Sequence, residues 1–204
     1  MTQSISQKLI HFFETTLNTY SVDSPEVVGW STRKTQHLRF QLLNEIACLD
    51  DASLLDVGCG VGDYWSYLRS SAPTVKYVGI DLNPRMISFA KKKYPQGAFI
   101  HQSLEEMEQK YDFVMSSGAF NLALEDNPAY LKGMILKMVK VARKGVAFNV
   151  LSQYAPYRMR YRDLYYYHPA EVFDFCRQNW ERVNLRHDYL SNDFTIHIKL
   201  KIDS

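Results

Sequence analysis

Cysteine is scarce in this sequence. Cys48, Cys59 and Cys176 are its three cysteines, they lie far apart, and no two of them form a C-x-x-C pair. An odd number at these spacings argues against a disulfide framework and against a zinc site. The sequence therefore predicts a cytoplasmic protein without a bound metal.

Long apolar runs and an excess of either charge are also missing. No stretch approaches the roughly 18 apolar residues of a membrane span, and the first residues, "MTQSISQKLIHFFETTL", lack the apolar run of a signal peptide. The chain has 24 Lys and Arg against 22 Asp and Glu, a formal net charge of +2. This balance gives no basic surface of the kind that binds nucleic acid. We expect no membrane contact, a small-molecule partner, and a monomer or homodimer.

Alternating short apolar runs and helical patterns fill most of the 204 residues, a length that suits one domain. Such alternation is typical of a doubly wound α/β sheet whose strands are mostly parallel. Near the C-terminus, "ERVNLRHDY" and "FTIHIKLKI" alternate apolar and polar residues and predict an antiparallel hairpin. The five expected parallel strands are "SLLDVG", "YVGIDL", "AFIHQ", "YDFVMSSG" and "GVAFNVLS".

Helical patterns precede and separate these strands. "SQKLIHFFETTL" and "TRKTQHLRFQLLNEIACL" predict two N-terminal helices that cover one edge of the sheet. The helices expected between strands are "GDYWSYLRSS", "NPRMISFAKKKYP" and "NPAYLKGMILKMVKVARK".

A glycine-rich turn follows the first expected strand, in "LLDVGCGVGDYWSYL". Gly58 and Gly60 match the first two glycines of the dinucleotide fingerprint, but its third glycine position holds Asp63. Asp56 and Asp63 place carboxylates where a pyrophosphate would lie. A buried carboxylate needs a cation or hydrogen-bond donors, so the turn suits a ligand with an ammonium or sulfonium group.

Asp81 ends the second expected strand, 19 residues after Gly62. An acidic residue at this spacing holds the hydroxyl groups of a ribose. Asp81 could instead cap the helix that begins at Pro84, although Asn83 is better placed for that role.

Taken together, the motifs resemble those of class I S-adenosylmethionine-dependent methyltransferases. "LLDVGCGVGD" is similar to their first motif, "YVGIDLNPRMISFAKKKYP" to their acidic strand and its helix, and "YDFVMSSGAFNLAL" to their fourth-strand motif. The terminal hairpin is similar to the reversed seventh strand of that fold. The resemblance implies a single domain with a helical cover over residues 1–50, a cofactor-binding core over 51–152, and a lid segment, helix and hairpin over 153–204.

The resemblance also implies a site for S-adenosylmethionine, which leaves as S-adenosylhomocysteine. Asp56 would lie near the amino group of the donor, Asp81 would bind its ribose, and Arg39 would pair with its carboxylate. Arg39 could equally be a solvated helix charge, and Trp30 a core anchor rather than a contact of the methionine end. The full set of expected donor-binding residues is Trp30, Arg39, Asp56, Gly58, Cys59, Gly60, Asp63, Asp81, Leu82, Met86, Ser103, Leu104, Ser117 and Gly118.

The acceptor is expected to be a small molecule, because "SSGAFN" lacks the two prolines found after the fourth strand in some DNA and protein methyltransferases of this fold. Four tyrosines at three-to-four spacing in "YAPYRMRYRDLYYYHPAEVF" predict one helical face, either a substrate lid or a packing stripe. Candidate acceptor contacts are Asn121, Tyr154, Tyr157, Arg158 and Tyr161. His101, His187, Asp188 and a tyrosine of this tract could each serve as a base, so we assign no catalytic residue.

Three other functions fit parts of this pattern. The chain could bind S-adenosylmethionine or S-adenosylhomocysteine without catalysis, methylate RNA or protein, or use a nicotinamide dinucleotide as an oxidoreductase.

Overall fold

The computed structural model describes residues 4–29 and 31–200. These residues form a seven-stranded sheet with the strand order β3-β2-β1-β4-β5-β7-β6. The strands β1 to β5 pair in parallel, and β7 runs antiparallel to both β5 and β6. The predicted doubly wound sheet and terminal hairpin are therefore confirmed. The strands are β1 (Ser53–Val57), β2 (Lys76–Asp81), β3 (Ala98–His101), β4 (Tyr111–Ser117), β5 (Ala142–Leu151), β6 (Arg182–Leu190) and β7 (Asp193–Lys199).

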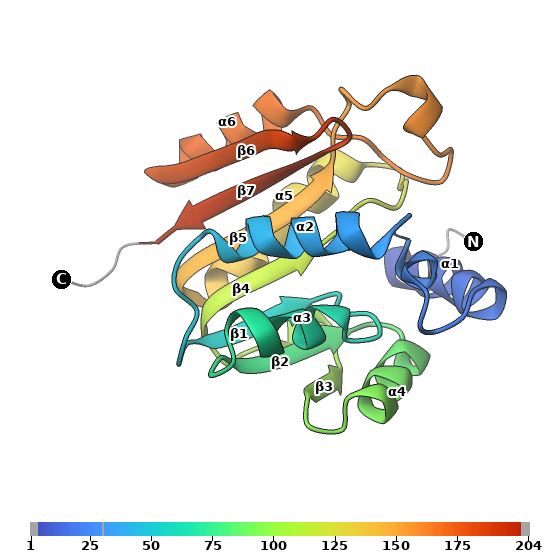
Figure 1. The fold of residues 1–204 in the computed structure, drawn as a ribbon. Coiled ribbons are helices and arrows are strands. Elements are labelled where there is room, and N and C mark those ends of the chain that lie inside the picture. Colours follow the sequence, from blue (N-terminus) through green and yellow to red (C-terminus); the bar gives the residue numbers. More distant parts are fainter. Residues whose placement is uncertain (1–3, 30, 201–204) are drawn as a thin grey trace.

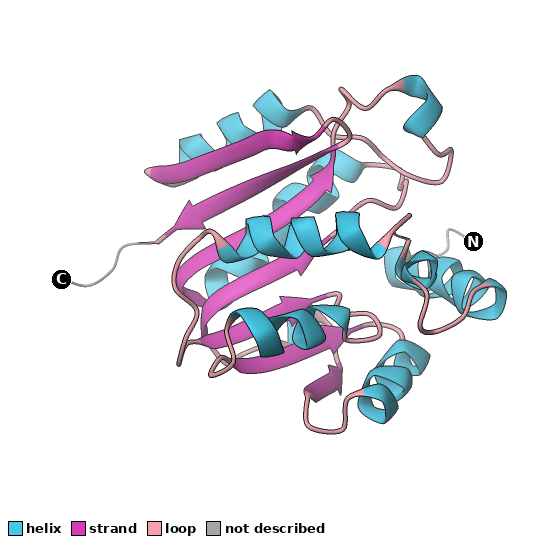
Figure 2. Ribbon diagram, viewed as in Figure 1, coloured by secondary structure: helices cyan, strands magenta, loops and turns pink. Residues whose placement is uncertain are grey.

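Helices cover both faces of this sheet (Figures 1 and 2). Because side chains alternate along a strand, β1 sends Leu54 into one core and Leu55 into the other. The first core includes side chains of α2, α3 and α4, whereas the second includes those of α5 and α6. The helices are α1 (Ile5–Thr19), α2 (Arg33–Asn44), α3 (Asp63–Ser71), α4 (Pro84–Lys93), α5 (Asn127–Val141) and α6 (Pro169–Asn179), with short 3₁₀ turns η1 (Pro25–Val28), η2 (Leu104–Glu106) and η3 (Tyr157–Met159).

The helices after β2 and β4 begin where the sequence predicted. Asn83 caps α4, since its side chain accepts hydrogen bonds from the backbone N–H groups of Arg85 and Met86. Asp126 caps α5 in the same way, by accepting from Ala129. A proline follows each cap, at a position where its missing N–H costs nothing.

The sequence predicted that the N-terminal helices cover an edge of the sheet, and this prediction is wrong. Instead, α2 lies across the face formed by β4, β5 and β7, because Phe40, Leu43 and Ile46 are buried in the core there. It ends at Asn44, earlier than the helical pattern through Leu49 indicated. Helix α1 lies at the carboxyl ends of the parallel strands (Figure 1).

Residues 154–168 of the tyrosine-rich tract form a loop that contains the short turn η3, and the predicted helical face is wrong. Its backbone bonds to distant segments: Tyr165 N donates to Asn121 O at 2.7 Å, and Tyr167 N donates to Leu151 O at 2.8 Å. Tyr167 is buried and its hydroxyl donates to Phe120 O at 2.7 Å. These long-range bonds outweigh the local three-to-four spacing, so residues 154–168 are held near the ends of β4 and β5 without forming an α-helix.

None of the helices within the described ranges has both the length and the apolarity that a membrane crossing requires.

Candidate functional site

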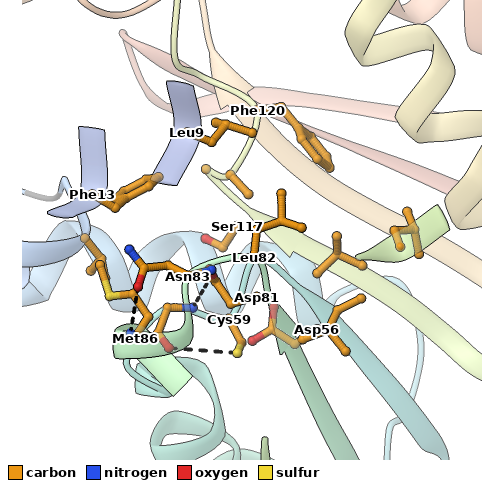
Figure 3. Close-up of a pocket in the computed structure, with 18 of the residues that line it drawn as sticks. Leu9, Phe13, Asp56, Cys59, Asp81, Leu82, Asn83, Met86, Ser117 and Phe120 are labelled. Carbon is orange, nitrogen blue, oxygen red and sulfur yellow. Dashed lines mark hydrogen bonds between the residues drawn. The ribbon is translucent and has the colours of Figure 1, made fainter. Parts of the chain in front are cut away.

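A cavity of about 260 Å³ opens at the carboxyl ends of β1, β2 and β4 (Figure 3). Its floor is the turn between β1 and α3, and one wall is the segment that follows β2. Helix α1 forms the opposite wall, with Leu9 and Phe13 facing the cavity. Carboxyl ends of parallel strands are where open α/β sheets bind ligands. The cavity is thus the candidate functional site.

The glycine-rich turn is shaped by its packing against neighbouring loops. Gly58 has a φ of +76°, and a Cβ there would lie 2.4 Å from the Cβ of Ala119 in the loop after β4. Gly60 has a φ of +54°, and its N–H donates to Asp81 Oδ2 at 2.9 Å. Only glycine combines this backbone geometry with such close contact. The turn can therefore present backbone atoms directly to the cavity.

Asp81 lies at the end of β2 and lines the cavity. Its Oδ1 accepts a hydrogen bond from Asn83 N at 2.8 Å, while Oδ2 accepts from Gly60 N. Burial raises the pKa of this carboxyl group, and the two backbone hydrogen bonds act in the opposite direction. Each carboxylate oxygen has a second lone pair that remains available to a ligand hydroxyl.

Asp56 is buried at the carboxyl end of β1 and also lines the cavity. Burial raises its pKa to about 7, the hydrogen bond from the Tyr77 hydroxyl at 2.7 Å lowers it, and the neighbouring Asp81 raises it. Tyr77 is neutral, since burial raises the pKa of its hydroxyl well above the usual value. The cavity wall thus holds a carboxyl group that a bound cation would ionise.

Asp63 differs from the other two acids because this chain already neutralises it. Its carboxylate lies 3.0 Å from Arg33 Nη1 and 3.3 Å from Lys93 Nζ, and it accepts a hydrogen bond from Gln36 Nε2 at 3.0 Å. Asp63 and Gln36 both line the cavity. The network joins α2, α3 and α4 at the cavity floor, so the charge of Asp63 is less available to a ligand than that of Asp56.

Most of the remaining expected donor residues also reach the cavity. Leu82 and Met86 line it on one side, and Ser117 and Gly118 on another. Cys59 contributes from the turn, and burial raises the pKa of its thiol well above the usual value. Leu104 lines the cavity with its neighbour Gln102, whereas Ser103 does not and instead forms a capping box with Glu106 at η2.

Arg39 is not at the cavity, contrary to the sequence prediction. It is buried, and its Nε donates to Asp193 Oδ2 at 2.8 Å, joining α2 to the start of β7. The alternative of a solvated helix charge is wrong as well. Asp193 is itself fully buried and needs a cationic partner, which explains why Arg39 turns toward the sheet. Trp30 lies outside the described residues.

The expected acceptor contacts lie elsewhere too. Asn121 is buried and its side chain accepts a hydrogen bond from Leu151 N at 2.9 Å, so it fastens the loop after β4 to the end of β5. The side chains of Tyr154, Tyr157 and Tyr161 are exposed, Tyr157 to 92%. None of these residues, nor Arg158, is among those that line the cavity.

Apolar residues that the sequence did not single out complete the cavity. They come from α1, from the loop after β4 and from α5, and the helical pattern of residues 6–17 was the one available signal for the α1 group. Its position over the strand ends depends on tertiary packing, which a local pattern does not reveal. These residues are Ile5, Leu9, Ile10, Phe13, Phe120, Tyr130 and Met134.

Residues 54–164, more than half of the chain, match the model of a protein family described as a methyltransferase domain. The chain belongs to the class I S-adenosylmethionine-dependent methyltransferases. A protein of Mycobacterium tuberculosis named as a methyltransferase is 30% identical over 158 residues, which cover 74% of this chain and 94% of that protein. The demethylmenaquinone methyltransferase of Chlorobaculum tepidum is 26% identical over 165 residues, 80% of this chain and 64% of that enzyme.

Solved structures of other methyltransferases share this fold. The magnesium protoporphyrin IX methyltransferase of Synechocystis with bound S-adenosylhomocysteine has a TM-score of 0.64 at 15% identity, covering 98% of this chain and 89% of that one. The plantazolicin methyltransferase, in complex with a pentazolic desmethyl analogue and S-adenosylhomocysteine, has a TM-score of 0.67 at 14% identity, covering 97% and 100%. At these identities the likeness establishes the methyltransferase fold.

Proposed function

We propose that this methyltransferase transfers the methyl group of S-adenosylmethionine to a small, largely apolar molecule. The observation that carries the proposal is the charge arrangement of the cavity. Asp56 and Asp81 line it, and within residues 4–29 and 31–200 neither has a cationic side chain at ion-pair distance. Lys137, the one Lys or Arg among the described lining residues, is paired with Glu105. Such a cavity suits a cationic nucleoside and disfavours a pyrophosphate.

The residues present fit the donor part by part. Asp81 would accept hydrogen bonds from the ribose hydroxyls, and Asp56 would face the amino group of the methionine moiety. Leu82 and Met86 provide an apolar surface for the adenine, while the glycine-rich turn and the Ser117–Gly118 corner approach the methionine moiety through backbone. Gly58 and Gly60 line the cavity, and Cβ atoms there would meet Ala119 and Val28, so only glycine fits this turn.

The chemistry requires little from the protein beyond placement. Bound S-adenosylmethionine supplies a methyl group on a positively charged sulfur, which departs as a neutral thioether while the acceptor atom forms the new bond. This chain's residues would hold donor and acceptor in line, and such positioning provides much of the acceleration in a displacement of this kind. The apolar side chains of Leu9, Phe13 and Phe120, which line the cavity, would shield the reacting atoms from water.

The apolar wall supports the proposed class of acceptor. Helix α1 presents Ile5, Leu9, Ile10 and Phe13 to the cavity, and the charged side chains of the lining are either paired or directed to the donor. The proteins compared above are named for demethylmenaquinone, magnesium protoporphyrin IX and plantazolicin, and these names support a small-molecule acceptor. The net charge of +2 likewise favours a small acceptor over nucleic acid.

We also propose that the protein is cytoplasmic. The free thiols of Cys59 and Cys176 support this location.

Calorimetric titration of the purified protein with S-adenosylmethionine, S-adenosylhomocysteine and NAD tests the donor assignment. We expect the first two to bind with dissociation constants near the micromolar range, about −8 kcal/mol, and NAD not to bind. Asp81→Ala should weaken binding by roughly 1 to 3 kcal/mol, because the ribose loses its acceptor.

Thermal unfolding of Asp81→Ala is measured alongside, since this side chain also fixes Gly60 and Asn83. Binding of NAD alone would overturn the proposal. Unchanged affinity in a folded Asp81→Ala protein would remove the ribose assignment and leave the donor to be placed differently.

A further inference from the structure

Asn83 carries a buried amide group whose oxygen forms hydrogen bonds within the described residues and whose nitrogen does not. The residue is 1% exposed and lines the cavity. Its Oδ1 accepts hydrogen bonds from Arg85 N at 2.9 Å and Met86 N at 3.2 Å. Its Nδ2 is buried and has no hydrogen-bond partner in the described part of the chain. An unsatisfied buried donor costs free energy, so this nitrogen is expected to meet a partner that the chain does not supply.

The capping role fixes the direction of the unpaired nitrogen. Because Oδ1 points to the first turn of α4, Nδ2 must point away from that helix. Figure 3 shows the amide nitrogen on the side of Phe13, with the amide oxygen turned toward Met86. The side chains of Phe13 and Met86 have no strong hydrogen-bond acceptor, so neither can satisfy the nitrogen.

The neighbouring carboxylate indicates what the nitrogen would meet. Asn83 N donates to Asp81 Oδ1 at 2.8 Å, so the Asp81 carboxylate and the Asn83 amide belong to one short turn. A carboxylate that accepts the hydrogen of a ribose hydroxyl leaves the oxygen of that hydroxyl with lone pairs that still need a donor.

We propose that Asn83 Nδ2 donates a hydrogen bond to a ribose hydroxyl oxygen of the donor, so that Asp81 and Asn83 together recognise the sugar as acceptor and donor. This inference rests on the proposed function, because it requires a nucleoside in the cavity. It assigns Asn83 two separate roles: its oxygen stabilises α4, and its nitrogen binds the ligand.

Replacing Asn83 with serine separates the two roles. Serine is as good a helix cap as asparagine but carries no amide nitrogen. We expect Asn83→Ser to leave the thermal unfolding temperature of the ligand-free protein unchanged and to weaken S-adenosylhomocysteine binding about tenfold in calorimetric titration. Asp126→Ser is the matched control, since it exchanges the exposed cap of α5 outside the cavity and should leave binding unchanged. Asn83→Thr provides a second cap variant if the serine protein unfolds.

The 2′-deoxy and 3′-deoxy analogues of S-adenosylhomocysteine identify the partner atom. One of them should bind wild type and Asn83→Ser equally, because it lacks the hydroxyl that the amide contacts. A tenfold loss that persists with both analogues would overturn the ribose assignment, as would equal binding of S-adenosylhomocysteine by wild type and both variants. If wild type does not bind S-adenosylhomocysteine at all, the proposed function itself fails, and this inference fails with it.

Discussion

At the scale of a single residue, we expect Asp56 to make donor binding depend on pH, because the proposed function places it beside the amino group of the donor. Its pKa of about 7 reflects burial in the ligand-free protein, so near neutrality the group is partly protonated. An ammonium group beside it favours the ionised form. On this proposal, donor binding releases the proton of Asp56, and the affinity falls at low pH, where Asp56 is protonated.

We expect the affinity for S-adenosylhomocysteine to rise between pH 6 and pH 8, with the steepest change, up to about tenfold per pH unit, below pH 7. Titrations at pH 7 in buffers of different ionisation enthalpy should show release of about half a proton per ligand bound. Asp56→Asn is the control, because its side chain does not ionise and its proton release should disappear. A flat pH profile in wild type would show that Asp56 does not face the ligand's cation.

The same ionisation acts on folding with a definite sign. Because the folded-state pKa of Asp56 lies above its ordinary value of 3.8, the folded chain binds this proton more tightly than the unfolded chain does. The stability that results is fully present below about pH 3.8 and is lost as the pH rises through about 7. Comparing the unfolding free energies of wild type and Asp56→Asn across this range isolates the contribution from those of other carboxylates.

At the scale of an element, α1 covers the cavity and is anchored at the cavity's edge and on the surface beyond it. Phe13 packs against a small cluster that contains Leu17, Val27 and Met86. Arg85 of α4 forms an ion pair with Glu14 and donates to Asn18 at 3.1 Å. These contacts hold the second half of α1, while Ile5 and Leu9 of its first half lie over the cavity.

Truncating Phe13 should therefore loosen the cover. We expect Phe13→Ala to speed dissociation of S-adenosylhomocysteine about tenfold, given that burying an aromatic side chain fully is worth about 1.5 to 3 kcal/mol and this one is partly buried. Stopped-flow displacement measures the rate. Phe12→Ala is the matched control, because the neighbouring ring does not line the cavity and its loss should not change the rate. Equal acceleration in both variants would mean that α1 responds as a whole to any loss of apolar area.

Across the whole molecule, the buried pair of Arg39 and Asp193 links the N-terminal helices to the last strand. Asp193 also accepts a hydrogen bond from the Tyr189 hydroxyl at 2.6 Å. Burial raises the pKa of Asp193, and Arg39 lowers it. Removing one partner of such a pair leaves the other as an uncompensated buried charge.

Arg39→Ala should lower the free energy of unfolding by about 3 to 5 kcal/mol and leave the affinity for S-adenosylhomocysteine unchanged. Denaturant titration and calorimetry on the same preparation measure the two quantities. The double variant Arg39→Met, Asp193→Leu should recover most of the stability, because an apolar pair needs no charge compensation. Weaker ligand binding without a loss of stability would instead support the sequence prediction that Arg39 pairs with the carboxylate of the donor.

The sequence could predict those features that local spacing determines. Alternating apolar residues indicated the hairpin of β6 and β7, and the interval from Gly62 to Asp81 placed an acid at the end of β2 beside the glycine-rich turn. It could not predict features that depend on distant partners. Arg39 forms an ion pair with Asp193, which lies 154 positions later in the sequence. The tyrosine tract does not form the predicted helix because its backbone N–H groups donate to the carbonyl oxygens of Asn121 and Leu151. The contribution of α1 to the cavity was missed for the same reason.

The order of the strands also governs when the protein can finish folding as it is synthesised. Strand β7 lies between β5 and β6 and contacts α2, an element that leaves the ribosome roughly 150 residues earlier, since Arg39 and Asp193 are 154 positions apart. Until β7 emerges, β5 has an open edge and Arg39 has no Asp193. The first helices and central strands of a nascent chain therefore stay incompletely joined, and the open edge of β5 stays exposed to aggregation, until β7 has been translated.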